Sequence, residues 1–575
     1  MIRGGKHHIE PERCYCTSPV MGPSQTTRRD RQEMKSCGTE GIEDKTCRAP
    51  LGLPSLCKAG ASSGLVAQDK LGQHSSAKNI VQHAFNQNRS KSLMSNSHEA
   101  IDVSARKPPL LNWRGVVLSL ICAVLLSWPM LFTSVPLGMF DTFAYFDVGK
   151  DEVEMLSGMA AKLLPDRVDV GWADASVVAK SEHVADQPKK PQQFRSFVYS
   201  AYIYTTSLTR IGLYLPVLLQ TSATLLMFFS FVASSPRASW LRLGGAALFV
   251  GTLTTLPWFA SYAMPDILAA LVVLYYVLLV ERIDRLQTGW QVAFMAITAF
   301  AVSCHYGHLP LAAGLIGVIL VLRLFMQSLT LRVVVLAASP LAIAVFLNLF
   351  GSAIALDKME FTPKRIPILL ARSIDDGPAY WYLQDACPKA QYTICKVMPV
   401  IPRDMGTFLW TEKGIGRATR EELDKIRAEE ATVLWHAFLA YPAEQTYSLL
   451  RNTAQQIVQV GTGEIHPLLP SGSDGLGLEP GDPDQKQYRA FAVFDVVTKV
   501  GTALGIGLLL SLWLKGELRG PEVRTIAVCL LGLVGNALIF GGLSAPVDRY
   551  QSRVIWILPA FAFLYWLGAH QKAGP

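Results

Sequence analysis

Nine polar residues stand at the ends of long apolar segments and could together perform chemistry. They are Asp141, Asp147, Arg195, Asp266, His305, His308, Arg549, Tyr550 and Arg553. An arginine guanidinium matches the oxygens of a phosphate group and can bind two of them at once. An aspartate can accept a proton from an attacking hydroxyl or amine. Brought to one face of a membrane, these residue types suit a site that handles a phosphate-bearing lipid.

Each of these residues also has a simpler interpretation. Asp266 follows Pro265 and could be an acid at a helix N-terminus, where it interacts with the helix dipole. Asp141 could cap the helix that follows it. Arg549 could anchor the chain at the membrane interface, and His305 and the nearby His308 could satisfy backbone groups there. The common location of all nine favours a joint role over nine separate ones.

The composition indicates a membrane protein. Of the 575 residues, 50% are hydrophobic and 17% are charged, whereas soluble domains carry about 25% charged residues. The apolar residues also occur in blocks of a length that can cross a bilayer. The net charge of +8 comes from dispersed lysines and arginines, which fits cytoplasmic loops and gives no support for a nucleic-acid partner.

The hydropathy pattern predicts an all-α polytopic membrane protein with about ten transmembrane helices. Two long loops interrupt the series, at 136–210 and at 353–493. The predicted spans are 116–135, 211–233, 242–260, 265–281, 289–304, 308–326, 331–352, 494–514, 523–543 and 553–569.

The positive charges of the short loops predict the orientation. Alternate short loops hold lysines and arginines, and the loops between them hold almost none; 261–264 and 305–307 have no lysine or arginine. The N-terminus is therefore predicted to be cytoplasmic. With ten spans the C-terminus is cytoplasmic as well, and both long loops are extracytoplasmic, together with the nine polar residues.

The domain plan has four parts. Residues 1–110 lack apolar periodicity and a signal peptide and are predicted to be a disordered cytoplasmic leader, with Met94 as an alternative natural start. Residues 111–352 form an N-terminal transmembrane module that includes the first outer loop, and 494–575 form the C-terminal transmembrane helices. Between them, 353–493 is a partly helical loop domain.

Three local features of the loop domain follow from its sequence. Helical spacing covers 417–460, and Pro442 is expected to break or kink it. The Gly- and Pro-rich segment 461–488 is predicted to be a loop. Cys387 and Cys395 lie on the predicted outer side, where a disulfide is allowed, and the sequence alone does not decide whether they form one.

The layout resembles the lipid-linked-sugar glycosyltransferases of the GT-C class, including the protein mannosyltransferase and lipid A aminoarabinose transferase relatives. The resemblance covers roughly 112–569. It is carried by the sequence FDTFAYFD after the first span, by an RS-x-x-Y segment at Arg195, by MPD at the start of the fourth span, and by the late Arg549, Tyr550 and Pro559.

The resemblance implies roles for the candidate residues. Asp141 is expected to be the catalytic base, with Asp147 as the second candidate, and Arg195 and Arg549 are expected to bind the lipid phosphate. The implied partners are a polyprenyl-phosphate-linked sugar, a lipid, glycan or protein acceptor, and membrane lipids. No cofactor is expected, because the first loop lacks the adjacent acidic pair or D-x-D that would support a divalent metal. The implied location is a bacterial inner (plasma) membrane.

Three alternatives remain. A surface-polysaccharide polymerase or ligase also uses outer arginines and histidines on a lipid pyrophosphate, and the pair His305 and His308 favours it. A transporter is disfavoured because the predicted spans two to seven hold almost no ionisable residue at mid-depth. In the later spans, Asp495 and Lys499 lie one helical turn apart, which a structural ion pair explains. A catalytically inactive assembly partner is the third alternative.

Overall fold

The computed structural model describes residues 113–163, 195–233, 240–356, 359–360, 365–470, 478–480 and 489–570. The chain divides into two units, Met1–Asp102 and Val103–Pro575, and the described residues all belong to the second. The predicted leader, with Met94, lies outside the described residues. So does the middle of the first outer loop, 164–194.

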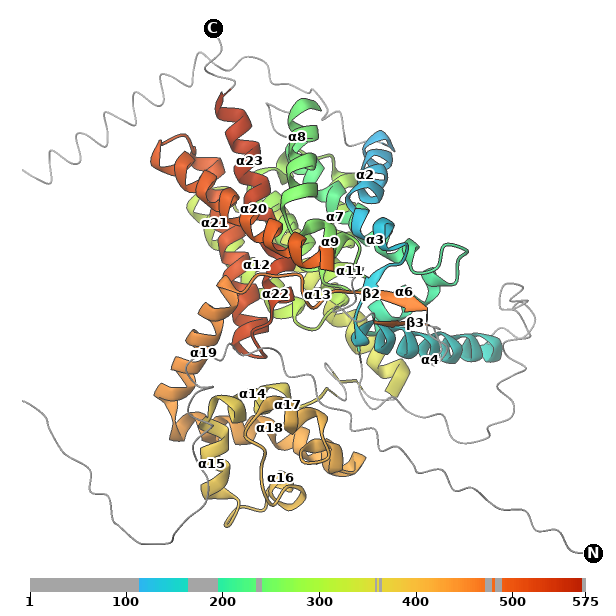
Figure 1. Ribbon diagram of the computed structural model, residues 1–575, viewed down its shortest axis with the longest axis vertical. Helices are drawn as coiled ribbons and strands as arrows, with labels where there is room; N and C mark the ends of the chain where they lie inside the picture. The colour runs from blue at the N-terminus through green and yellow to red at the C-terminus, as the bar shows by residue number, and fades with distance from the viewer. Residues whose placement is uncertain are drawn as a thin grey trace, which may run out of the picture. The chain divides into compact units, whose positions relative to one another are not determined.

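The described residues are mostly helical, at 78%, as the hydropathy pattern predicts (Figure 1). The helices of the first half are α2 (Trp113–Leu126), α3 (Trp128–Thr133), α4 (Phe140–Leu163), α6 (Phe197–Ser207), α7 (Tyr214–Ala233), α8 (Trp240–Leu253), α9 (Leu256–Ala260), α10 (Ile267–Glu281), α11 (Thr288–Ser303), α12 (His308–Phe325) and α13 (Leu331–Leu356). The later helices are α14 (Ile368–Asp376), α15 (Pro378–Ala386), α16 (Thr393–Val397), α17 (Met405–Trp410), α18 (Arg420–Ala440), α19 (Pro442–Val458), α20 (Arg489–Leu514), α21 (Gly520–Asn536), the π-helix η5 (Ala537–Gly542), α22 (Asp548–Ile555) and α23 (Ile557–His570).

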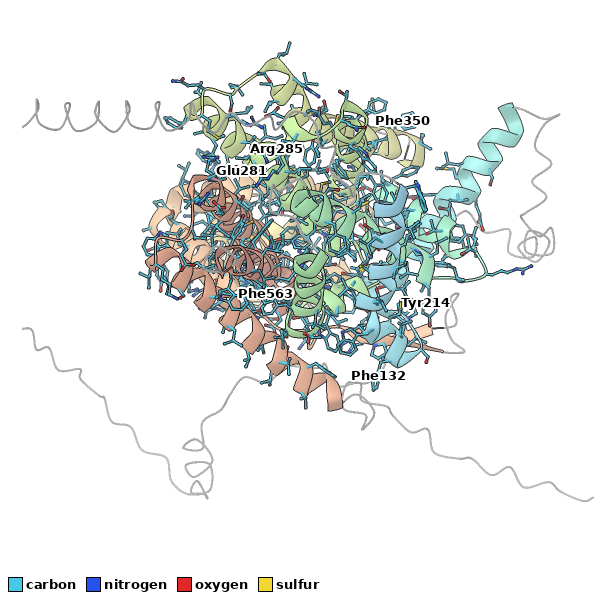
Figure 2. All side chains as sticks on the ribbon, turned by 90° about the horizontal axis from the view of Figure 1, so that it is seen from above. Phe132, Tyr214, Glu281, Arg285, Phe350 and Phe563 are labelled. Atoms are coloured by element: carbon cyan, nitrogen blue, oxygen red, sulfur yellow. A yellow bond between two sulfur atoms is a disulfide. The ribbon has the colours of Figure 1, made fainter. Side chains whose placement is uncertain are left out.

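Among the residues that the structure describes, four helical segments are long and apolar enough to cross a membrane: His308–Phe325, Leu331–Ile354, Ala492–Leu514 and Gly520–Gly542. They coincide with four of the ten predicted spans. Shorter apolar helical stretches cover Gly115–Leu126, Tyr214–Ser230, Ile267–Glu281 and Thr288–Ser303. Large apolar side chains such as Phe132 and Phe350 are exposed and point away from the core, as expected of a surface that contacts lipid (Figure 2).

Prolines divide three of the predicted spans into two helices each. A proline ring clashes with the carbonyl group four residues earlier and donates no hydrogen bond, so a helix ends near that carbonyl. Accordingly α2 ends at Leu126, three residues before Pro129. Helix α8 ends at Leu253, four residues before Pro257. Likewise α22 ends at Ile555, four residues before Pro559.

A proline inside α13 is accommodated by neighbouring tyrosines. Pro340 leaves the carbonyl group of Leu336 without its helical donor. The hydroxyl of Tyr275, on α10, donates to that carbonyl at 2.7 Å, and the hydroxyl of Tyr276 donates to the carbonyl of Ala337 at 3.2 Å. The helix therefore continues past the proline because α10 supplies the missing donors.

Helix α10 lies at the centre of the helical assembly. Every residue from Ile267 to Val280 is buried, which requires neighbours on all sides, and α7, α11, α12 and α21 pack against it. Asp266 is the residue directly before this helix. Its carboxylate is thereby placed at the end of a helix that is buried along almost its whole length.

A small antiparallel sheet joins three outer segments of the chain. Strand β1 (Leu137–Gly138) pairs with β2 (His466–Pro470), and β2 pairs with β3 (Leu478–Pro480). Leu137 also accepts from the amide of Ala263 at 2.8 Å and donates to the carbonyl of Ser261 at 2.9 Å. The prediction that 461–488 is only a loop was thus wrong for β2 and β3, because β2 pairs with the distant strand β1 and β3 pairs in turn with β2.

The loop domain has a hydrophobic cluster of its own. Buried side chains from Leu370 to Ala437 form it, contributed by helices α14 to α18. The predicted break at Pro442 is confirmed, since α18 ends at Ala440 and α19 begins with the proline. Cys387 and Cys395 form a disulfide, which answers the question that the sequence left open.

This disulfide predicts a measurable local stabilisation. Closing a loop of this length lowers the entropy of the unfolded chain by an amount equivalent to about 2–3 kcal/mol. Replacing both cysteines by serine should therefore increase trypsin cleavage between α14 and α18, measured by peptide mass spectrometry. A Cys122→Ser variant, whose half-buried thiol is not in a disulfide, is the control. Equal cleavage in both variants would show that the disulfide does not stabilise this domain.

Candidate functional site

A cavity of about 520 Å³ lies where α4, the start of α10, the turn before α12, η5, α22 and the segment before α14 meet. Among its lining residues are seven of the nine polar residues predicted from the sequence: Asp141, Arg195, Asp266, His305, Arg549, Tyr550 and Arg553. The sheet described above explains this convergence. It fixes β1 just before Asp141, and its link to Ala263 fixes the segment just before Asp266.

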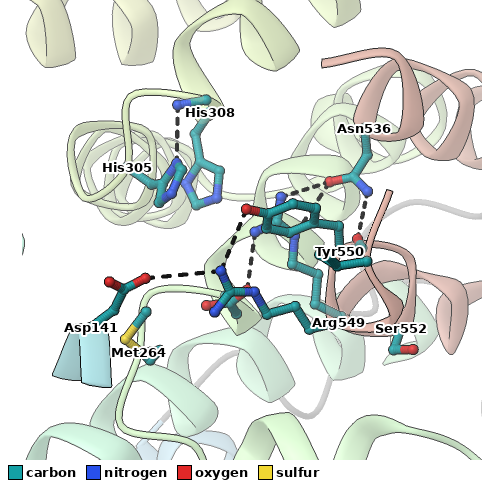
Figure 3. A network of polar contacts seen from close by, with 12 residues as sticks. Asp141, Met264, His305, His308, Asn536, Arg549, Tyr550 and Ser552 are labelled. Atoms are coloured by element: carbon teal, nitrogen blue, oxygen red, sulfur yellow. Dashed lines mark hydrogen bonds and ion pairs between the residues drawn. The ribbon is translucent and has the colours of Figure 1, made fainter. Parts of the chain in front are cut away.

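Asp141 joins arginines from two distant parts of the chain. It lies in the first turn of α4, and its Oδ1 accepts a hydrogen bond from Arg195 Nη2 at 2.5 Å. Its Oδ2 lies 3.9 Å from Arg549 Nη2 (Figure 3). The Asp141 side chain is 29% exposed, so its carboxylate remains accessible from the cavity.

Both arginines keep unused hydrogen-bond donors. The Nε–H groups of Arg195 and Arg549 are buried and have no hydrogen-bond partner among the described residues. Glu464 Oε2 is 3.8 Å from Arg549 Nε, which is an ionic contact and too long for a hydrogen bond. Burial raises the pKa of Glu464, and the charge of Arg549 opposes that rise. Two guanidinium groups with spare donors form a natural binding place for an anion.

Aromatic rings hold the arginines in position. The guanidinium carbon of Arg195 lies 5.7 Å from the centre of the Tyr145 ring, and that of Arg549 lies 5.0 Å from the centre of the Tyr550 ring. Both distances allow a cation–π attraction. Tyr145 is one helical turn after Asp141 on α4, so one face of this helix supplies both the carboxylate and the ring.

A second ion pair lies deeper and is almost fully enclosed. Arg553 Nη1 donates to Asp266 Oδ1 at 3.1 Å, and Arg553 Nη2 donates to Asn536 Oδ1 at 3.0 Å. The guanidinium carbon also lies 3.8 Å from the centre of the Phe540 ring. Asp266 lies at the N-terminus of α10, as the sequence suggested, but makes no side-chain hydrogen bond to that helix. Its carboxylate also neutralises a buried arginine, so the helix dipole is not its only partner.

The two histidines have different positions. His305 lies in the turn between α11 and α12 and lines the cavity, and its Nδ1 accepts from the amide of Gly307 at 3.0 Å. Burial, together with the charges of His308 and Arg553, holds its pKa well below the usual range. His308 is not among the cavity residues; its Nδ1 lies 2.8 Å from the carbonyl oxygen of Ala301, and its Nε2 is buried without a hydrogen-bond partner.

Asp147 is the other predicted residue that the cavity does not include. It lies six residues after Asp141 on α4, which corresponds to about 240° around the helix axis. Its side chain is exposed, whereas Asp141 and Tyr145 line the cavity. The helical geometry of α4 therefore separates the two aspartates that the sequence grouped together.

Sequence reasoning missed a fourth arginine. Arg365 lines the cavity from the segment just before α14, and it forms an ion pair with the buried Glu430 of α18. Ile368 and Leu369, at the start of α14, line the cavity too. The loop domain therefore contributes a wall of the site. No signal in the sequence singles out Arg365, because the predicted loop domain 353–493 contains eight arginines.

The lining is positively charged overall. It contains four arginines, Arg195, Arg365, Arg549 and Arg553, against the two carboxylates of Asp141 and Asp266. Within the described part of the chain, no group of three or more histidine, cysteine, aspartate or glutamate side chains could hold a metal ion. The positive charges of the lining are those of these four guanidinium groups.

An apolar groove of about 960 Å³ lies on the other side of α22. Arg549, Tyr550 and Arg553 face the cavity, whereas Asp548, Gln551 and Ile555 of the same helix line the groove. The rest of the groove comes mainly from apolar residues of α20 and α21, two of the candidate membrane spans. One short helix thus separates a polar, cationic cavity from a long apolar groove.

Comparison with known proteins adds no assignment. No family model, no curated protein and no solved structure matches this chain. The fold and the site define an integral membrane protein with a cationic cavity beside an apolar groove.

The two carboxylates of the site should respond differently to mutation. Asp266→Ala removes the partner of a fully buried arginine, and breaking a buried ion pair costs about 3–5 kcal/mol. Asp141→Asn affects a partly exposed carboxylate and should cost less than about 1 kcal/mol. Thermal unfolding of the purified variants in one detergent measures both. A melting temperature for Asp266→Ala no lower than that for Asp141→Asn would contradict a structural role for the Asp266–Arg553 pair.

Proposed function

We propose that this chain is a membrane glycosyltransferase that moves a sugar from a polyprenyl-phosphate donor to an extracytoplasmic acceptor. The observation that carries the proposal is the meeting of Asp141 with Arg195 and Arg549 in one cavity, beside an apolar groove. A phosphate joined to a long hydrocarbon chain has the same two parts, an anion and an apolar tail.

In this proposal the arginines bind the donor phosphate. The spare Nε–H groups of Arg195 and Arg549 would donate to phosphate oxygens, and charge-assisted hydrogen bonds of this kind are about twice as strong as neutral ones. Arg365 lies on the same lining and adds positive charge. The groove between α20 and α21 would receive part of the polyprenyl chain.

Asp141 would act as the base of the reaction. The acceptor oxygen or nitrogen attacks the anomeric carbon and forms the new bond, while the bond between that carbon and the phosphate oxygen breaks. The acceptor proton passes to Asp141, and the lipid phosphate leaves with the electron pair. Because a phosphate is already a good leaving group, the reaction needs no general acid. A single displacement inverts the configuration at the anomeric carbon.

The proposal includes the predicted topology. Ten spans and a cytoplasmic N-terminus would place the cavity and the loop domain on the extracytoplasmic side, in a bacterial inner membrane. The four candidate spans, with the proline-divided helices that precede and follow them, support a chain that crosses the bilayer many times. Asp495 and Lys499 form an ion pair at 2.7 Å, as the sequence suggested, which weakens the case for a transport pathway through them.

One observation favours a second candidate, a surface-polysaccharide polymerase or ligase. His305 lines the cavity, and because its Nδ1 accepts from the amide of Gly307, its Nε2 carries a hydrogen that it could donate to a phosphate oxygen. In that case the donor would be a lipid pyrophosphate, and His305 would help the arginines to bind it. An inactive His305→Gln variant with an active Asp141→Asn variant would favour this candidate.

Mutation of Asp141 and of Arg549 should separate catalysis from donor binding. Asp141→Asn should abolish transfer, measured by mass analysis of surface glycans in a complemented deletion strain, yet it should still bind polyprenyl phosphate. Arg549→Ala should weaken binding of polyprenyl phosphate about 10- to 150-fold, because a hydrogen bond to a charged group is worth roughly 1.5–3 kcal/mol.

Two further variants serve as controls for these measurements. Arg420→Ala removes an exposed arginine of α18 and should change neither binding nor transfer. Asp147→Asn tests the other predicted base. Normal transfer by Asp141→Asn together with loss of transfer by Asp147→Asn would move the base to Asp147, and normal transfer by both would remove the chemical basis of the proposal.

The proposed orientation can be tested at Lys413, an exposed residue of the loop domain. In intact cells, a Lys413→Cys variant should react with a membrane-impermeant maleimide because the loop domain is proposed to face outward. The unsubstituted protein, treated in the same way, gives the background from native cysteines. Reaction only after the membrane is permeabilised would reverse the orientation.

A further inference from the structure

Helix α19 is amphipathic, but its polar face is buried and its apolar face is exposed. Its buried residues are the polar Ser448, Asn452, Thr453 and Gln456. Its opposite face carries large apolar side chains that are exposed: Tyr447 (65%), Leu450 (61%), Ile457 (37%) and Val458 (78%). A helix of a soluble domain places its apolar face inward, so this face must have another partner.

Hydrogen bonds fix the helix in this orientation. Gln456 Nε2 donates to the carbonyl of Val547 at 2.8 Å, and its Oε1 accepts from the amide of Val547 at 2.9 Å. Asn452 Nδ2 donates to both carboxylate oxygens of Asp376, at 2.9 and 3.1 Å. Rotating α19 to bury its apolar face would break these bonds and leave buried polar groups unpaired, which is costly.

Close packing gives a second constraint. The virtual Cβ of Gly541 would lie 2.3 Å from Gln456 Cβ, and that of Gly542 would lie 2.6 Å from Thr453 Oγ1. Both glycines belong to η5, which continues the candidate span α21. The polar face of α19 is therefore packed directly on the end of a membrane helix.

The exposed face is continuous with surface that belongs in lipid. Ile457 and Val458 line the apolar groove together with Leu510 of α20 and Leu530 and Val534 of α21. Leu510, Leu530 and Val534 are themselves exposed, on two candidate spans. The apolar face of α19 thus extends the lipid-facing surface of these spans without interruption.

We propose that this face of α19, formed by Tyr447, Leu450, Ile457 and Val458, is a membrane-contact surface. Its partner is the phospholipid bilayer, at the boundary between headgroups and acyl chains, where apolar side chains and tyrosine are favoured. Tyr447 and Val458 are about 16 Å apart along the helix axis, at 1.5 Å per residue. Because Val458 lines the groove, it lies deeper in the bilayer than Tyr447.

This contact has a consequence for the cavity. Asp376, which accepts hydrogen bonds from Asn452, is the last residue of α14. The first residues of α14, Ile368 and Leu369, line the cavity. The membrane-contact helix is therefore linked, through Asp376, to one wall of the cavity. The membrane contact does not depend on the proposed reaction.

Photocrosslinking of the full-length protein tests the proposal. A benzophenone side chain is introduced in turn at Val458, Leu450 and Tyr447, in nanodiscs of phosphatidylglycerol and phosphatidylethanolamine. Gln455, an exposed polar residue on the flank of the same helix, is the matched control. After irradiation, mass spectrometry should find phospholipid adducts several-fold more abundant at Val458 and Leu450 than at Gln455, with Tyr447 lower than Val458.

Two results would overturn the proposal. Phospholipid adducts at Val458 and Leu450 that are no more abundant than at Gln455 would mean that lipid does not cover this face. Adducts mainly to a second copy of the chain would mean that the face is a protein interface. Gel filtration of each variant verifies that it is folded and monodisperse, and all four positions are exposed, so the substitutions disturb no packed core.

Discussion

The charge of four arginines gathered in one enclosed cavity is the constraint on which the rest of the structure depends. A buried charge is tolerated only when another charge or a set of hydrogen bonds compensates it. Arg553 has Asp266 and Asn536 and is closed off, whereas Arg195 and Arg549 share the partly exposed Asp141. The deeper pair is therefore structural, and the shallower group keeps donors that a ligand can use.

Meeting that constraint requires segments from the whole chain. The carboxylates are Asp141, at the start of α4, and Asp266, before α10, and two of the arginines come from α22, nearly 300 residues after Asp266. The short sheet brings the two carboxylates near each other, since β1 bonds both to β2 and to the segment before Asp266. The loop domain adds Arg365, which Glu430 holds in place. The site thus exists only when the transmembrane and outer parts are assembled.

The short helix α22 separates two environments, the cationic cavity and the apolar groove. One face of α22 presents cations to the cavity, and the other lines the apolar groove between α20 and α21. Such a division suits an amphiphilic substrate, because an anion is stabilised by the arginines of the cavity and a hydrocarbon tail by the apolar groove. Helix α19 has the opposite arrangement: its polar face packs on protein, and its apolar face is exposed.

The sequence alone determined the class of the protein and the types of residue at its site. Apolar blocks and sparse charge predict membrane helices because hydropathy is a local property, and seven of the nine predicted polar residues line one cavity. Only the tertiary structure decided their partners. It paired Asp266 with Arg553, separated Asp147 from Asp141, and added Arg365 and Glu464. It also built β2 in a Gly- and Pro-rich segment. Ion pairs and strand pairing join residues distant in the chain, and no local pattern records which distant residues will meet.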